Sequence, residues 1–137
     1  MLRSILAIIA GSVAWMVTAL GMDAVLMALA PQFFDGNGKV ESLPLLLFMM
    51  AYSLSFSVLG GYVTAFVAKR KELQHALALG MLQFAMGLAA TVKFFDTAPL
   101  WYHVLFLTLL IPAILIGGRL RMMQKHKRVG HASHATA

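Results

Sequence analysis

Four long runs of apolar residues alternate with short polar segments along this chain. The clearest run, from Leu43 to Ala68, contains no charged residue and is followed at once by Lys69, Arg70 and Lys71. As a helix this run would rise roughly 39 Å, which is enough to cross a hydrocarbon core of about 30 Å with some tilt. The pattern therefore predicts a membrane-spanning helix that ends at a cluster of cations.

The other three apolar runs cover about residues 5–29, 75–92 and 100–118. Together with residues 43–68 they predict an all-α fold, an integral membrane bundle of four helices within residues 1–128. The first run is too long for the apolar region of a signal peptide, so we expect it to remain in the protein as a span. Residues 129–137 are small and polar, and they predict a flexible C-terminal tail.

Lysine and arginine are distributed unequally between the two ends of the predicted spans. Nine of the 11 lie at one end, and the remaining two, Lys39 and Lys93, lie at the other. The nine are Arg3, Lys69, Arg70, Lys71, Arg119, Arg121, Lys125, Lys127 and Arg128. Because cations beside spans are retained in the cytoplasm, the sequence predicts that both termini lie there.

Composition indicates lipid as the solvent of this chain. Hydrophobic residues make up 61% and charged residues 12%, whereas soluble domains contain about 25% charged residues. The net charge of +6 is placed mostly beside the spans, which favours contact with anionic headgroups over nucleic acid. The sequence contains no cysteine, which excludes disulfides, thiolate metal sites and iron–sulfur clusters.

The two halves of the chain share a faint repeat. Phe33-Phe34-Asp35 and Phe94-Phe95-Asp96 each precede a proline, Pro44 or Pro99, and the span that follows each proline ends in a Gly-Gly pair. This order is that of two tandem helix hairpins in the same orientation. The sequence leaves open whether a duplication produced it or whether helix hairpins share these features in general.

Small residues recur along one face of three spans, at alternating spacings of four and three. They are Ala7, Gly11, Ala14, Thr18 and Gly21 in the first span, Ser53, Ser57, Gly60 and Thr64 in the second, and Ala76, Gly80, Gln83, Gly87 and Ala90 in the third. The spacing favours close helix contact with crossing angles near +20°, rather than a polar pathway. Pro112 predicts a kink in the fourth span.

Asp23 is the acidic residue placed within a predicted span. An intramembrane carboxylate is costly and usually faces a partner, and Lys93 and His103 are predicted at a similar depth. Asp23 also falls nearly opposite the small-residue face of its own helix, so the first span is expected to contact a further helix or subunit there. A carboxyl near the headgroups that reaches water is the alternative. Gln83 in the third span is a further candidate for an intramembrane polar contact.

The remaining polar residues predict no reaction chemistry. Lys69, Arg70, Lys71, Arg119 and Arg121 follow spans, where they set topology or bind lipid headgroups. His75 and His103 are predicted at opposite ends of their spans, so they cannot ligate one haem iron. His126, His131 and His134 are typical of a solvated tail rather than a metal site. We find no catalytic pair, metal-ligand set or phosphate loop, and therefore expect neither an enzyme nor a cofactor.

Several short segments carry a resemblance to a known family. They are the apolar span after Arg3, Gly60-Gly61-Tyr62-Val63, Pro99-Leu100-Trp101-Tyr102-His103 and Gly117-Gly118-Arg119. In this order they resemble small, uncharacterised four-span proteins of bacterial inner membranes. The resemblance implies a multi-pass location in the bacterial inner membrane, and it implies no activity and no site residues.

Two functions follow from the sequence as hypotheses. The first is an accessory, structural or assembly subunit of a larger bacterial inner-membrane complex, without catalytic chemistry of its own. The second is a small oligomeric transporter or channel for an ion or small solute, which would use Asp23, Gln83 and Pro112. The expected partners are membrane lipids and other membrane-protein subunits or further copies of this chain, and not nucleic acid.

Overall fold

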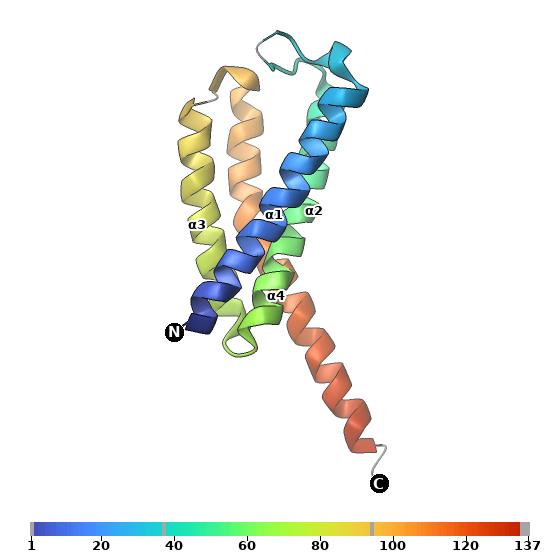
Figure 1. Cartoon of the computed structure of the whole chain (residues 1–137), viewed down its shortest axis with the longest axis vertical. Helices are drawn as coiled ribbons and strands as arrows, with labels where there is room; N and C mark the ends of the chain where they lie inside the picture. Colours follow the sequence, from blue (N-terminus) through green and yellow to red (C-terminus); the bar gives the residue numbers. More distant parts are fainter. Residues whose placement is uncertain (1, 37, 94, 135–137) are drawn as a thin grey trace.

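The computed structural model describes residues 2–36, 38–93 and 95–134, with side chains through residue 126. Four α-helices form a bundle (Figure 1): α1 (Leu2–Leu29), α2 (Leu43–Ala68), α3 (Glu72–Lys93) and α4 (Leu100–His134). Two short 3-10 helices, η1 (Pro31–Phe33) and η2 (Phe95–Thr97), lie in the connections. Each α-helix is long and apolar enough to cross a membrane, so the predicted all-α, four-span bundle is confirmed.

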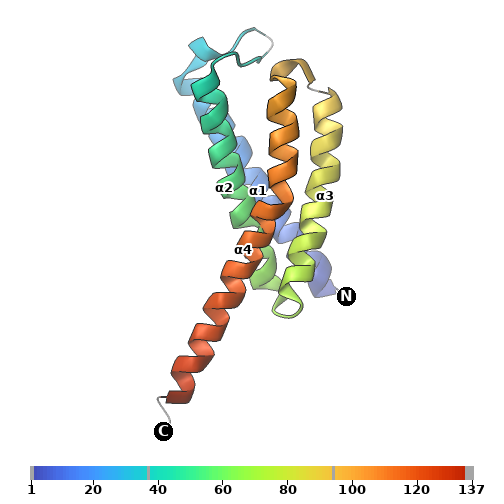
Figure 2. The same ribbon diagram turned by 180° about the vertical axis from the view of Figure 1, so that it is seen from behind.

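The helix boundaries agree with the sequence except at the C-terminal end. The fourth span was expected to end at Gly118, whereas α4 continues to His134 and extends away from the bundle in both views (Figures 1 and 2). The backbone of residues 129–134 is therefore helical; the flexibility of the tail at residues 129–137 stays a prediction, and residues 135–137 lie outside the described part. Residues 119–128 are largely Arg, Leu, Met, Gln and Lys, which are good helix formers; residues 129–134 contain Val, Gly, His and Ser, which are weaker ones.

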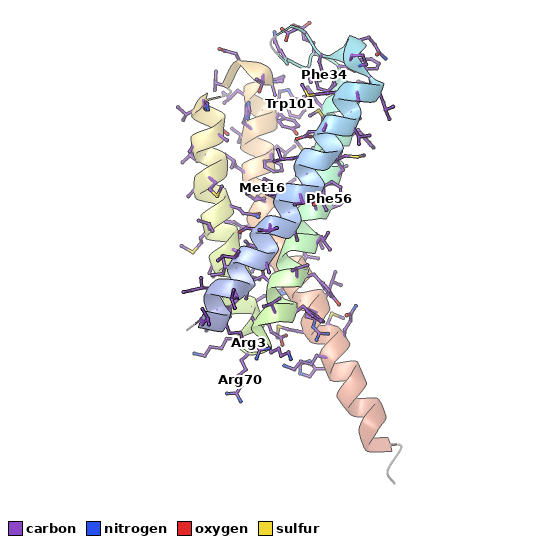
Figure 3. All side chains as sticks on the ribbon, in the orientation of Figure 1. Arg3, Met16, Phe34, Phe56, Arg70 and Trp101 are labelled. Carbon is purple, nitrogen blue, oxygen red and sulfur yellow. The ribbon has the colours of Figure 1, made fainter. Side chains whose placement is uncertain are left out.

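The two ends of the bundle differ in the residues that they carry. Arg3 and Arg70 lie at one end, and Phe34 and Trp101 lie at the other (Figure 3). We call these the inner and the outer end, after the predicted topology. The chain runs from inner to outer in α1 and α3 and back in α2 and α4, so the two hairpins have the same orientation (Figure 1).

The inner half of the bundle is tightly packed. Leu79, Leu110 and Ile114 are completely or almost completely buried and form the core with Ala76. Gly11 of α1 packs against α2 so closely that a methyl group on it would lie 2.7 Å from the carbonyl oxygen of Gly60. These small residues let the backbones approach, as expected for helices that have no hydrophobic drive to associate in lipid.

The packed face of α1 differs from the predicted one. Ala7, Gly11, Trp15, Ala19 and Asp23 follow one another at a constant spacing of four, and all five are buried or bonded to α2. A spacing of four follows one ridge of side chains on the helix surface, whereas the sequence predicted an alternation of four and three. The outer part of the predicted face is not used for packing, since Gly21 is exposed and has no neighbouring atom within 4 Å of its missing side chain.

The two hairpins stand farther apart at the outer end than at the inner end, in both views (Figures 1 and 2). The outer loops nevertheless meet, because the Val40 backbone N–H donates to the Thr97 carbonyl at 3.1 Å. Val40 is itself only 3% exposed.

In the same loop the Lys39 ammonium donates a hydrogen bond to the Glu41 carboxylate at 2.8 Å, and this contact raises the pKa of the lysine.

α4 changes direction in its middle part (Figure 2) and contains Pro112 within the helix. Proline cannot donate the hydrogen bond to the carbonyl four residues earlier, and its ring crowds that carbonyl. This agrees with the kink that the sequence predicted. The bend carries the inner part of α4 across α2, with which α4 makes its most extensive contact.

Candidate functional site

Asp23 is bound by a tyrosine of the neighbouring helix. The Tyr52 hydroxyl of α2 donates to Oδ1 of Asp23, in the outer half of the bundle. Six residues separate Asp23 from the end of α1 at Leu29, which places the carboxyl about 9 Å inside the outer end of the helix. Tyr52 is only 7% exposed, so this hydrogen bond is largely shielded from lipid and water.

The sequence identified the need for a partner of Asp23 but not the partner itself. Lys93 is the exposed last residue of α3, and His103 stacks on Phe95 of η2, with ring centroids 6.3 Å apart. Tyr102 of α4 lies close enough to Asp23 to interact with it electrostatically, and Nε2 of His103 is buried without a hydrogen-bond partner among the described residues. Within the chain, Asp23 therefore has the Tyr52 hydroxyl as a hydrogen-bond donor, and the predicted contact of this face with a further helix or subunit stays a prediction. The signal for this contact is the phenol hydroxyl of Tyr52, which can donate a hydrogen bond to a carboxylate as a basic side chain does.

The indole of Trp15 also finds a partner inside the bundle. Trp15 Nε1 donates to Ser57 Oγ at 3.1 Å, and the Ser57 hydroxyl in turn donates to the Ser53 carbonyl at 2.8 Å. Ser57 is fully buried. A buried indole N–H requires an acceptor, so this chain of hydrogen bonds fixes α1 against α2 at mid-depth.

Gln83 of α3 is buried without a hydrogen-bond partner. Its side chain is 4% exposed, and neither Nε2 nor Oε1 bonds to any residue that the structure describes. The hydroxyl of Ser12 on α1 is in the same state. Both residues line a crevice of about 220 Å³ between α1 and α3, whose other walls include Trp15 and Met86. An unpaired buried amide is costly, so the crevice is a place where the polar groups of this bundle are not fully satisfied.

The crevice lies near the middle of the spans. Gln83 is 11 residues from the start of α3 at Glu72 and 10 from its end at Lys93, so it is about 16 Å from either end. α1 and α3 contact each other less than the other packed helix pairs do. The crevice is therefore a gap between two loosely associated helices, at a depth where water is scarce.

Comparisons with family models, with curated proteins and with solved structures find no match for this chain. The structure by itself shows a multi-pass membrane protein with four candidate spans, whose apolar surface contacts lipid. Large hydrophobic side chains such as Val17 and Leu20 are more than half exposed, as expected where lipid is the solvent. Any finer assignment depends on the geometry.

The inner end gathers several of the predicted cations. Lys125 of α4 bonds to the Lys69 carbonyl at 3.0 Å and to Glu72 Oε1 at 2.9 Å. Arg121 lies over the ring of Phe66, with its guanidinium carbon 4.6 Å from the centroid. Arg119 is exposed. Among the described residues, no three His, Asp or Glu side chains come together as metal ligands would.

Proposed function

We propose that this protein is an accessory or assembly subunit of a larger bacterial inner-membrane complex, with no catalytic chemistry of its own. The observation that carries the proposal is the crevice between α1 and α3 with the unpaired amide of Gln83. A side chain that can both donate and accept, buried at mid-membrane depth, is suited to a hydrogen bond across helices. The partner we propose is a transmembrane helix that presents an amide or hydroxyl side chain at the same depth.

The surroundings of the crevice support a helix as the occupant. Beside it, Met16 and Leu20 of α1 and Met86 of α3 are exposed apolar side chains, so the crevice opens on a lipid-facing surface. Methionines at such a surface adapt readily to a packing partner. Asp23 already has a hydrogen-bond donor within the chain, Tyr52, whereas the amide of Gln83 has none among the described residues. The subunit proposal therefore rests on Gln83, although the sequence pointed to Asp23.

The proposed topology has both termini on the cytoplasmic side. It rests on the nine cations that the sequence assigns to the inner end against two at the outer end, since cations beside spans stay in the cytoplasm. Arg3 and Arg70 lie at that same end of the bundle (Figure 3). The even number of spans then returns the chain to the side on which it began.

Photocrosslinking in the native membrane tests the subunit proposal directly. A photoreactive residue in place of Met86, which lines the crevice, should give one defined product with a different protein. The matched control is the same probe in place of Val104, which is 56% exposed on α4 and should react with lipid. Replacement Gln83→Leu should lower the Met86 crosslink about threefold to tenfold, whereas Met81→Leu on the exposed face of α3 should not.

Two results would count against the proposal. Absence of a protein product from position 86, or an unchanged yield with Gln83→Leu, would remove the crevice as a docking site. A product with the mass of two copies of this chain would instead favour the second candidate, an oligomeric transporter or channel.

The second candidate is supported by Asp23, a carboxyl within a span that lies near two tyrosines, Tyr52 and Tyr102. Intramembrane carboxyl groups often mark ion or proton pathways. Purified protein in liposomes should then carry a proton- or ion-coupled flux that Asp23→Asn abolishes. If no flux above that of empty liposomes is found, the transporter hypothesis fails.

A further inference from the structure

The loop between α2 and α3 is held in place by a lysine from α4. α2 ends at Ala68, the C-cap residue Lys69 that follows it has a left-handed φ of 59°, and Lys71 has a φ of 49°. Lys125 Nζ donates to the Lys69 carbonyl at 3.0 Å and to Glu72 Oε1 at 2.9 Å. The Glu72 side chain is only 5% exposed, so its carboxylate is matched by Lys125 and is shielded from other cations.

Beside this clamp the chain forms a pocket of about 420 Å³ at the inner end. Its lining includes Arg70 and Lys71 from the loop, Leu73 and Gln74 from α3, and Met122 from α4. The side chains of Arg70 and Lys71 make no hydrogen bond or ion pair with any described residue. Because Lys125 is already paired with Glu72, these two charges give the pocket an uncompensated positive field.

We propose that this pocket binds the phosphate ester of an anionic lipid headgroup. A guanidinium and an ammonium that line one pocket can both bind phosphate oxygens, the first as a planar fork and the second as a point charge. Leu73 and Met122 offer an apolar wall to the glycerol and upper acyl carbons of the same lipid. This assignment goes beyond the role of these cations in topology and is independent of the crevice around Gln83.

The position of the pocket favours lipid over free phosphate. The pocket lies where α2 ends and α3 begins, at Ala68 and Glu72. Met122 is 22 residues along α4 from Leu100, or about 33 Å, close to the thickness of a hydrocarbon core of about 30 Å. Headgroups are found at this level, and basic pockets between helices on the cytoplasmic side are known places for anionic lipids.

Native mass spectrometry of the purified chain in detergent, titrated with phosphatidylglycerol or phosphatidylcholine, tests the assignment. Phosphatidylglycerol should bind at least tenfold more tightly than phosphatidylcholine, a comparison that needs no variant. Arg70→Gln should weaken phosphatidylglycerol binding about fivefold, and Arg70→Gln with Lys71→Gln about 25-fold. Arg119→Gln, which removes the same charge from an exposed residue at the same end outside the pocket, should change it less than twofold.

The results that overturn the proposal are equally definite. Equal binding of the two lipids, or an equal loss in Arg70→Gln and Arg119→Gln, would reduce these residues to general surface charge. Complete displacement of phosphatidylglycerol by millimolar inorganic phosphate would assign the pocket to free phosphate instead of lipid. Restoration of tight binding by Arg70→Lys would support the charge-based contact and show that the loop retains its fold.

Discussion

Gly61 of α2 and Gly117 of α4 face each other's backbone across two helices that run in the same direction. A methyl group on Gly61 would lie 2.0 Å from the Ile114 carbonyl oxygen, and one on Gly117 would lie 1.9 Å from that of Val58. Each glycine therefore fits against the residue three positions before the other. This reciprocal contact joins the two hairpins and accounts for one glycine of each Gly-Gly pair. The other glycine of each pair packs elsewhere, Gly60 against α1 and Gly118 against α3.

Replacement of Gly117 by alanine should separate α2 from α4. The new methyl group would meet backbone atoms, which cannot rotate away, so we expect the free energy of unfolding to fall by about 3 kcal/mol. Unfolding in mixed detergent micelles, followed by circular dichroism, measures this change. Gly21→Ala is the control, because the space beside Gly21 is open, and it should leave stability unchanged or slightly higher. Equal behaviour of the two variants would contradict the packing described.

Loss of the Tyr52 hydroxyl should leave the Asp23 carboxyl in the outer half of the bundle without this hydrogen-bond donor, and the protein should become less stable. Tyr52→Phe removes the donor to Asp23, and we expect it to lower the free energy of unfolding by about 1–3 kcal/mol. Asp23→Asn keeps an acceptor oxygen and should cost less. In the double variant the loss should be smaller than the sum of the single losses, because the two residues share one interaction. Simple additivity would show that they are independent.

The bond between Trp15 and Ser57 should be visible in fluorescence. The chain contains two tryptophans, so the experiment uses a Trp101→Phe background. Ser57→Ala removes the acceptor at 3.1 Å from the indole nitrogen, and emission should shift to shorter wavelength because a polar neighbour is lost. Ser55→Ala, whose hydroxyl bonds only to its own helix at the Ala51 carbonyl, should leave the emission unchanged. A shift of equal size in both variants would contradict the assignment.

The predicted topology can be tested with single cysteines, because the sequence contains none. Gly36→Cys in the first outer loop should react with a membrane-impermeant maleimide in intact cells. His126→Cys in the inner part of α4 should react only after the membrane is permeabilised. Reaction of position 126 in intact cells, with position 36 protected, would invert the orientation. Reaction of both in intact cells would contradict the three crossings predicted between positions 36 and 126.

The four spans could be predicted because span length and charge are properties of the sequence alone. Leu43–Ala68 shows this best, since its predicted ends are those of α2. α4 continues past the predicted end of the fourth span at Gly118, because hydropathy falls there while helix propensity stays high through Arg128. The tail histidines at 131 and 134 fall where side chains are not described, so their predicted solvated state stays a prediction.

The contacts between spans were harder to predict, because they depend on how each helix is rotated and inclined. The small-residue face of α1 is used around Gly11 but not around Gly21, since α1 packs along a row of fours and its contact face turns along its length. The same turn brings Asp23 to Tyr52. Gln83 was recognised as a candidate polar contact, yet the sequence could not reveal that its amide stays unpaired beside a crevice.

Val40 and Thr97 connect the outer loops through main-chain atoms, at the end where the hairpins stand farthest apart. The glycine contact between α2 and α4 lies toward the opposite end. Thermal opening should consequently proceed as a wedge, with the loops parting before the glycines do. Backbone amides near Val40 would then exchange with solvent long before those around Gly61, and the molecule would lose its order from one face of the bilayer toward the other.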